Sequence, residues 1–137
     1  MTGRLIIDLS IAGNARGEVQ KCLDEIEDEV TVRRSRVPKN VPEYLPGNTT
    51  DYFARIYKCQ LEYLPDVVNA VFLNKCNAVA ARLEKISTLP EGIFLTLGFH
   101  VFDATDNYYV PIPKSLIQEV SRTDTQLYFE NLSTQSE

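Results

Sequence analysis

Residues 61–89 place the strongest limit on how this 137-residue chain can fold. Their apolar side chains recur at steps of three and four positions, which is the spacing of one face of an α-helix. This apolar series consists of Leu64, Val68, Val71, Val79, Leu83 and Ile86, with Cys76 filling the gap. Pro65 fits the first turn of such a helix, and Pro90 with Gly92 would end it. The pattern therefore predicts one long helix that lies across a small sheet.

The rest of the chain alternates between strand-like and helix-like patterns. Apolar and β-branched residues at alternating positions predict strands at 4–12, 30–37, 51–60, 93–102, 108–112 and 126–132. Helical spacing predicts two shorter helices at 17–29 and 115–122. Residues 93–102 are the most apolar of the strands, so we expect them at the centre of the sheet. The arginines in 30–37 are typical of an edge strand.

The expected element order is β-α-β-β-α-β-β-α-β. No glycine-rich loop follows a strand, which disfavours a doubly wound nucleotide-binding fold. Hairpins around helices favour an α+β fold of ferredoxin-like style, with a mostly antiparallel sheet of about six strands. One long and two short helices would cover one face of that sheet. We predict a single domain over residues 1–132, followed by a disordered tail at 133–137.

Composition limits which partners this domain could bind and where in the cell it would be found. The net charge of -5 disfavours nucleic-acid binding that depends on neutralising phosphates. No run approaches the ~18 apolar residues of a membrane span, and no cleavable signal precedes the first strand. We therefore expect a cytoplasmic protein with no membrane contact. Cys22, Cys59 and Cys76 form no CxxC pair, and we expect buried, reduced thiols.

His100 is the single histidine and thus the one candidate for an imidazole base. Asp103 and Asp106 follow in the next turn and could orient it, although turn formation alone accounts for both. No serine or cysteine has a nucleophile setting, and one histidine with three scattered thiols lacks metal-ligand spacing. We predict no enzyme activity, no metal and no cofactor. An enzyme that uses His100 stays as a third hypothesis.

Two groups of residues suggest a binding surface. Arg33, Arg34, Arg36 and Lys39, at the start of a proline-rich loop at 38–50, could hold a phosphate, an RNA backbone or an acidic protein surface. Pairing with the acidic run at 24–29 is the simpler account of these arginines. Tyrosine is favoured at interfaces, and Tyr108 and Tyr109 lie at the predicted free edge beside Pro111. The predicted binding residues are Arg33, Arg34, Arg36, Tyr108 and Tyr109.

Residues 51–132 also carry a resemblance. They contain an aromatic strand (DYFARIYKC), a strand-turn-strand (GIFLTLGFHVFDATDNYYVPIP) and a closing helix and strand (SLIQEVSRTDTQLYFEN). In this order of elements the segment resembles a family of small bacterial proteins catalogued as a domain of unknown function. That family usually carries a tryptophan before the long helix, where this chain has Tyr52 or Phe53. The resemblance implies an α+β fold and a bacterial setting, and some such families act as immunity proteins.

We expect a small non-catalytic protein-binding domain, including the immunity type that neutralises a partner protein. Its acidity would suit a basic partner. The alternative is a protein that binds a nucleotide or metabolite between the long helix and the sheet, or at the seam of a homodimer. Val67, Phe72 and Leu73 lie outside the apolar stripe of the long helix. Either the helix is wrapped on a second side, or that side contacts a partner or a second subunit.

Overall fold

The computed structural model describes residues 3–26, 30–34, 52–63, 70–102 and 110–132. In chain order its elements are β1 (Gly3–Gly13), α1 (Arg16–Ile26), β2 (Arg33–Arg34), β3 (Tyr52–Tyr63), α2 (Ala70–Glu84), β4 (Ile93–Phe102), α3 (Lys114–Arg122) and β5 (Gln126–Leu132). The predicted α+β fold, with one longer and two shorter helices, is confirmed over these residues. None of the described helices combines the length and the apolar character that a membrane crossing requires.

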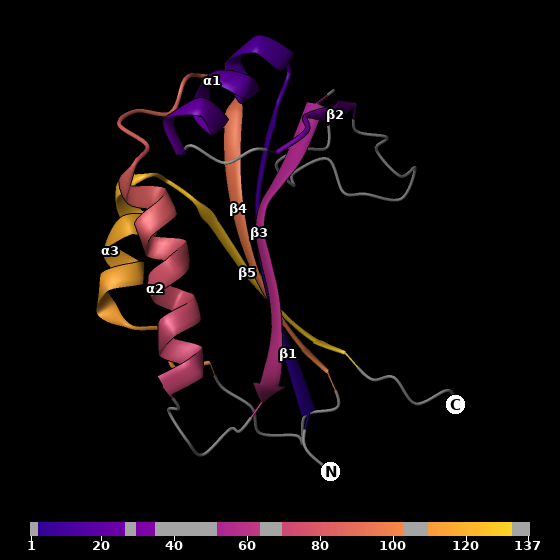
Figure 1. The fold of residues 1–137 in the computed structure, drawn as a ribbon, viewed down its shortest axis with the longest axis vertical. Coiled ribbons are helices and arrows are strands. Elements are labelled where there is room, and N and C mark those ends of the chain that lie inside the picture. The colour runs from indigo at the N-terminus through magenta and orange to yellow at the C-terminus, as the bar shows by residue number, and fades with distance from the viewer. Residues whose placement is uncertain (1–2, 27–29, 35–51, 64–69, 103–109, 133–137) are drawn as a thin grey trace.

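The strands form one mixed sheet in the order β2-β3-β1-β4-β5 (Figure 1). β1 lies between β3 and β4 and runs antiparallel to both, and β2 runs antiparallel to β3. β5 runs parallel to β4 because α3 carries the chain back along the sheet between them. This parallel pair means that the ferredoxin-like order is not confirmed. The sixth strand predicted at 108–112 is not seen in residues 110–112, and residues 108–109 lie outside the described ranges.

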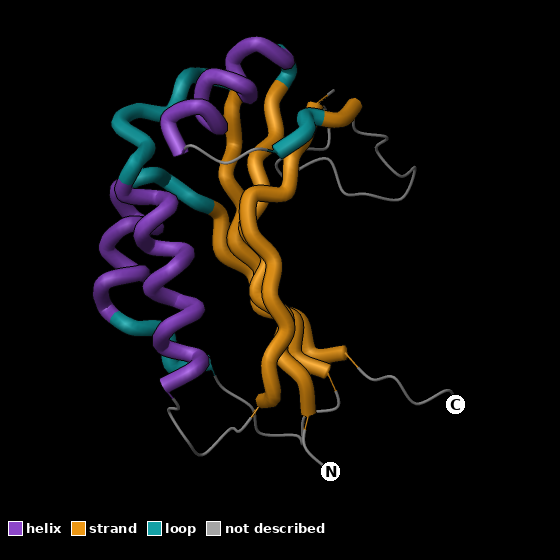
Figure 2. Tube along the Cα trace, in the orientation of Figure 1, coloured by secondary structure: helices purple, strands orange, loops and turns teal. Residues whose placement is uncertain are grey.

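The described helices all lie on one face of the sheet, and the opposite face carries none of them (Figure 2). Alternate residues of β1 and β4 point at the helices and are buried, as the two-residue period of a strand requires. These side chains are Leu5, Ile7, Leu9, Ile11, Ile93, Leu95, Leu97, Phe99 and Val101. From the helices, Val19, Leu23, Val79, Leu83 and Leu116 complete the core. The strand at 93–102 is therefore interior as predicted, with β1 beside it.

The long helix differs from its prediction at its start and in its buried face. Residues 61–63 belong to β3, because Leu61 pairs with Leu5 of β1 in the sheet register. Residues 64–69 lie outside the described ranges. Val71, predicted to face the core, is 56% exposed, whereas Phe72 is 4% exposed. The second contact face predicted around Phe72 is therefore part of the core, and Val67 falls among the residues not described.

Other predictions are confirmed in part. β2 lies at the sheet edge as expected but is two residues long, and residues 35–37 lie outside the described ranges. The loop at 38–50 and the tail at 133–137 also lie outside them. The cysteines are free, with Cys22 and Cys76 buried and Cys59 half-buried. Burial raises the pKa of the Cys76 thiol to about 12, so this thiol keeps its proton at neutral pH.

The turn from α3 into β5 places Asp124 in the left-handed conformation, with a φ of 54°. The backbone N–H of Thr125 donates to the carbonyl of Val120 at 3.0 Å, and that of Asp124 donates to Ser121 at 3.3 Å. This pair of bonds is the Schellman motif, in which glycine is the usual residue at the left-handed position. The hydroxyls of Thr123 and Thr125 share a buried hydrogen bond of 2.6 Å beside it. The turn fixes where β5 begins.

We expect Asp124→Gly to raise the free energy of unfolding by about 0.5–1 kcal/mol, because glycine adopts a positive φ without the steric cost of a Cβ atom. Urea unfolding of the purified variant measures the change. Asp124→Ala is the control, since it removes the carboxylate but keeps the Cβ. Equal stabilisation by both variants would show that charge, and not backbone conformation, is the cause.

Candidate functional site

Polar and aromatic side chains from widely separated segments meet on the face of the sheet that no described helix covers (Figure 2). The register places Asp8 of β1 opposite Gly98 of β4, and Gly98 opposite Tyr128 of β5. Residues opposite one another in neighbouring strands share a face of the sheet. We call this group of side chains the open-face cluster, and it consists of Asp8, Arg55, His100, Tyr128 and Glu130.

One half of the open-face cluster is an arginine–carboxylate pair. The Nε and Nη2 groups of Arg55 donate to the two carboxylate oxygens of Asp8, at 3.1 Å and 3.3 Å. This two-pronged geometry fixes the plane of the guanidinium as well as its position. The Asp8 side chain is 18% exposed and that of Arg55 is 48% exposed. Asp8 therefore holds an arginine that solvent or a ligand can still reach.

The other half is built around His100. Its Nε2 atom lies 3.5 Å from the Tyr128 hydroxyl, and its Nδ1 atom lies 3.4 Å from a carboxylate oxygen of Glu130. The two rings meet edge to face, with an interplanar angle of 78°. A Cβ atom at Gly98 would lie 2.7 Å from Cζ of Tyr128 and 2.8 Å from Nε2 of His100. The absence of a side chain at Gly98 thus lets both rings lie close to the sheet.

The surroundings of Tyr128 raise its pKa, chiefly through burial and further through the carboxylates of Asp8 and Glu130, while Arg55 acts in the opposite direction. The phenol therefore keeps its proton at neutral pH and can donate a hydrogen bond. Within the described ranges, no three His, Cys, Asp or Glu side chains gather closely enough to hold a metal ion. The open-face cluster offers hydrogen bonds, charge and aromatic surface.

Other aromatic side chains lie on the open face of the sheet or at its β5 edge. Phe94 pairs with Ala12 in the strand register and is 37% exposed, close to the 38% of Tyr128. The guanidinium of Arg4 lies 4.8 Å from the centre of the Phe102 ring, in a cation–π contact. At the edge of the described sheet, β5 has a neighbour on one side only, and its Phe129 is 45% exposed. Both the face and this edge therefore present aromatic groups to solvent.

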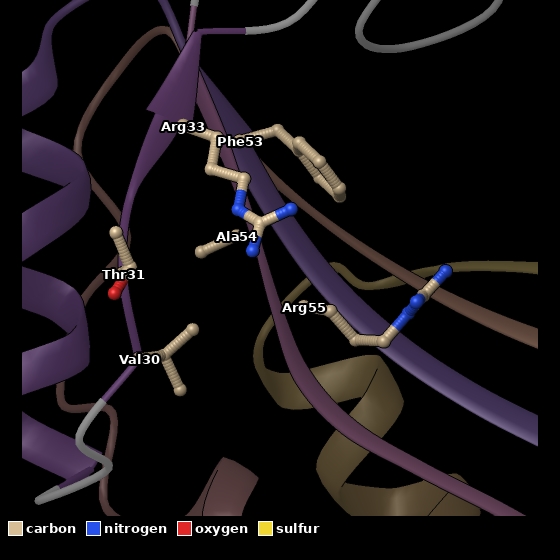
Figure 3. Close-up of a pocket in the computed structure, with 6 residues that line it drawn as sticks. All are labelled: Val30, Thr31, Arg33, Phe53, Ala54 and Arg55. Atoms are coloured by element: carbon tan, nitrogen blue, oxygen red, sulfur yellow. The ribbon is translucent and has the colours of Figure 1, made fainter.

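A cleft of about 300 Å³ opens where β2 meets β3. It is lined by Val30, Thr31, Arg33, Phe53, Ala54 and Arg55 (Figure 3). Arg33 is exposed and pairs with Phe53 in the strand register. Figure 3 shows the Arg33 side chain between residues 30–31 on one side and Phe53 with Arg55 on the other. Arg55 therefore takes part both in the open-face cluster and in the wall of this cleft.

The structure brings together only part of the binding surface predicted from the sequence. Arg33 lines the cleft, and the backbone of Arg34 pairs with Tyr52 in β3. The side chain of Arg34 and the whole of Arg36, Tyr108 and Tyr109 lie outside the described residues.

His100 lies on the second face of its strand as predicted, half-buried, but its partners differ from those expected. Tyr128 and Glu130 contact it, whereas Asp103 and Asp106 lie outside the described ranges. Sequence reasoning missed the remaining members of the open-face cluster. Alternation along residues 4–12 placed Asp8 on the side away from the core, but no local pattern indicates which strands lie beside it.

No family model, curated protein sequence or solved structure matches this chain. The resemblance to a bacterial domain of unknown function thus stays a prediction. Any functional assignment has to follow from the chemistry of the open-face cluster and the cleft.

Proposed function

We propose that this protein is a non-catalytic binding domain that engages a partner protein through the open face of its sheet. The observation that carries the proposal is the open-face cluster, in which charged and aromatic side chains gather on a face that no described helix covers. Tyrosine, phenylalanine and arginine are enriched at protein interfaces, and tyrosine and arginine supply many of the residues that dominate binding energy.

The way these side chains are held supports binding over catalysis. Asp8 orients the guanidinium of Arg55, and the ring of Tyr128 packs edge to face against His100 in the space that Gly98 leaves. A partner that docks here would meet side chains already ordered, so less rotamer freedom would be lost on association. Tyr128 would act as a donor, because its raised pKa disfavours the phenolate.

The edge at β5 extends this surface. β5 pairs with β4 on one side, and its residues from Gln126 to Asn131 are exposed. An extended segment of a partner could add to such an edge through backbone hydrogen bonds. A second copy of this chain is the alternative occupant of the edge. Sedimentation equilibrium would separate the two, because only self-pairing makes the mass depend on the concentration of the purified protein alone.

An immunity-type role in the cytoplasm is the finer form of the proposal, with the bacterial setting that the resemblance implies. In this role the domain would cover a partner protein and neutralise it. The net charge of -5 supports a basic partner, since complementary potentials speed encounter and exclude like-charged proteins. Neighbouring genes provide an independent check, because an immunity protein would be encoded beside its target.

We expect Tyr128→Ala to weaken partner binding by about tenfold or more, because truncation of an exposed tyrosine that becomes buried at the centre of an interface has effects of this size. Cross-linking in extracts of the source cells would identify the partner, and calorimetric titration of the purified pair would give the affinities. Val71→Ser is the matched control, because Val71 is 56% exposed on α2, on the helix side. Unchanged affinity in Tyr128→Ala, or a loss confined to Val71→Ser, would refute docking through the open face.

A further inference from the structure

We infer that β5 is the seam of a symmetric dimer, in which it pairs antiparallel with β5 of a second copy of this chain, centred on Tyr128. Of the two occupants considered for the β5 edge, this assigns the second copy. The inference does not rest on docking through the open face, because Leu127 and Phe129, which carry it, lie on the helix side of the sheet. Their neighbours in β4, Leu97 and Phe99, are fully buried on that side.

The two edges of the described sheet differ in their protection against pairing. Natural edge strands are kept from pairing by charged side chains, by proline or by being short. At one edge, β2 is two residues long, and β3 beyond it exposes Arg55, Lys58 and Glu62. At the other edge, β5 is seven residues long and contains no proline, and Glu130 is its one charged residue. β5 is therefore the edge that is open to a further strand.

β5 exposes apolar side chains on both faces of the sheet. Leu127 is 37% exposed and Phe129 is 45% exposed on the helix side, and Tyr128 is 38% exposed on the open face. The outer edge of β5 also carries backbone N–H and C=O groups that no described strand pairs with. A further strand would remove the apolar surface from water and satisfy these backbone groups. Such a strand needs apolar residues opposite Leu127 and Phe129.

The sequence of β5 itself supplies a strand of this kind. In an antiparallel pair centred on Tyr128, Leu127 lies opposite Phe129 of the second copy, and Phe129 lies opposite Leu127 of the second copy. Two apolar–aromatic pairs thus form on the helix side, and the two Tyr128 side chains meet on the open face. β5 is therefore complementary to itself, as a symmetric dimer interface requires.

Charge selects this register over its neighbours. Gln126 lies opposite Glu130 of the second copy, so the amide can donate to the carboxylate, and the two Glu130 carboxylates do not face one another. A register centred on Glu130 would place these like charges directly opposite, which is destabilising. A register centred on Phe129 would place Leu127 opposite the polar Asn131 and lose both apolar–aromatic pairs.

Pairing in the Tyr128-centred register keeps the two sheets continuous. Residues directly opposite one another share a face, so the helices of both copies lie on one side of the joined sheet and both open-face clusters lie on the other. The contact uses the same edge of each copy, which closes the assembly at two chains. The edges left outside are those formed by β2 and β3, where charged side chains are exposed.

Sedimentation equilibrium of the full chain at about 5–500 µM tests the dimer. A contact of one short strand from each copy is at the low end of interface size, so we expect a dissociation constant on the order of 10–100 µM. The average mass should rise with concentration from 15.5 kDa toward twice this value. A mass that stays at 15.5 kDa throughout overturns the inference and leaves the edge to a strand of a partner protein.

Leu127→Lys should raise the dissociation constant at least about tenfold, because it removes an apolar pair and places a lysine on the edge strand. Circular dichroism and urea unfolding establish that the variant keeps its fold. Val71→Lys is the matched control, since it makes the same change in charge at an exposed apolar position on α2. It should dimerise as the unsubstituted chain does. Equal weakening by the two variants would place the contact elsewhere and overturn the inference.

Single cysteines test the register without a change of charge at Leu127 or Phe129. Gln126→Cys, Tyr128→Cys and Glu130→Cys are each oxidised with copper phenanthroline in air, and the disulfide-linked dimer is measured on non-reducing gels. Only position 128 lies opposite itself, with Cβ atoms about 4.5–5.5 Å apart, which is near the reach of a disulfide. Tyr128→Cys should therefore cross-link fastest, above the background of the three native cysteines in the unsubstituted chain. Equal rates at the three positions, or a faster rate for Glu130→Cys, would overturn the inference.

Discussion

Phe99→Ala should lower the free energy of unfolding by about 3–5 kcal/mol, because it removes a large aromatic side chain from a fully enclosed site. Phe99 is 0% exposed and lies in β4, inside the sheet. Its ring stacks on that of Phe129 in β5, with centroids 5.4 Å apart and an interplanar angle of 14°. The substitution would leave a cavity beneath the helices that rigid strands cannot close. Equilibrium unfolding in urea measures the loss.

Phe129→Ala is the matched comparison, since it removes the other ring of the same pair. Phe129 is 45% exposed, so truncating it creates no buried cavity. The substitution should lower the free energy of unfolding by about 1 kcal/mol, which is within the range measured for an aromatic pair. The double variant would give the coupling between the rings directly. Equal costs for the two single variants would mean that the stacking contact, and not the enclosure of Phe99, provides the stability.

Gly13→Ala should lower the free energy of unfolding by about 1–3 kcal/mol through overpacking. A Cβ atom at Gly13 would collide with Cδ1 of Ile93 and would lie 3.0 Å from Cγ2 of Val19 and 3.3 Å from the carbonyl oxygen of Gly92. The Gly92 oxygen belongs to the backbone of a turn, so it cannot move aside as a side chain could. Thermal and urea unfolding of the variant would both register the effect.

Gly17→Ala is the control for this prediction, since it makes the same chemical change within α1. No described heavy atom lies within 4 Å of a Cβ placed at Gly17. Alanine should therefore stabilise the helix by about 0.5–1 kcal/mol relative to glycine. If Gly13→Ala lowers the free energy of unfolding and Gly17→Ala raises it, the lack of space for a Cβ atom is what requires glycine at position 13. A stabilising Gly13→Ala would disprove the close packing at the end of β1.

The sequence pattern predicted correctly those strands in which burial alternates regularly from one residue to the next. β1 alternates strictly between buried and other residues, and β4 does so except at Gly98, which is buried on the open face. The alternation arises because the helices cover one face of the sheet. β3 does not alternate in this way, since the register shifts between Leu9 and Ser10 of β1. On β3, Ala54 and Ile56 are buried, and Cys59 and Leu61 also pack against the core. A register shift of this kind is typical of a β-bulge, after which each residue of the strand points to the opposite face of the sheet. The alternation of apolar residues in the sequence does not show where the shift occurs.

The start of the long helix was mispredicted for a related reason. Apolar residues near position 61 fit a helical stripe, but Leu61 is held in the sheet by pairing with Leu5, far away in the sequence. The choice of Val71 over Phe72 for the buried face was wrong because the stripe was anchored on residues before position 70. Tertiary pairing overrides local spacing at such junctions.

The open-face cluster could be predicted only one residue at a time. Alternation placed Asp8 and His100 on the faces of their strands that point away from the core. Arg55 pairs with Asp8 across 47 positions, and Tyr128 meets His100 across 28. These contacts between side chains depend on the order of the strands in the sheet, which the sequence pattern does not determine. Arg33 was predicted from its charge, but its position in the wall of the same cleft as Arg55 follows from the pairing of β2 with β3.

The central position of β1 also has a consequence for biosynthesis. β1 leaves the ribosome before both of its partners, which are Tyr52–Tyr63 and Ile93–Phe102. At about 5–20 residues per second, the edge of β1 that pairs with β4 would stay open for roughly 5–20 s. An unpaired edge of an apolar strand is prone to aggregation, so we expect destabilising substitutions in β4 to lower the yield of folded protein in cells in part through aggregation during synthesis.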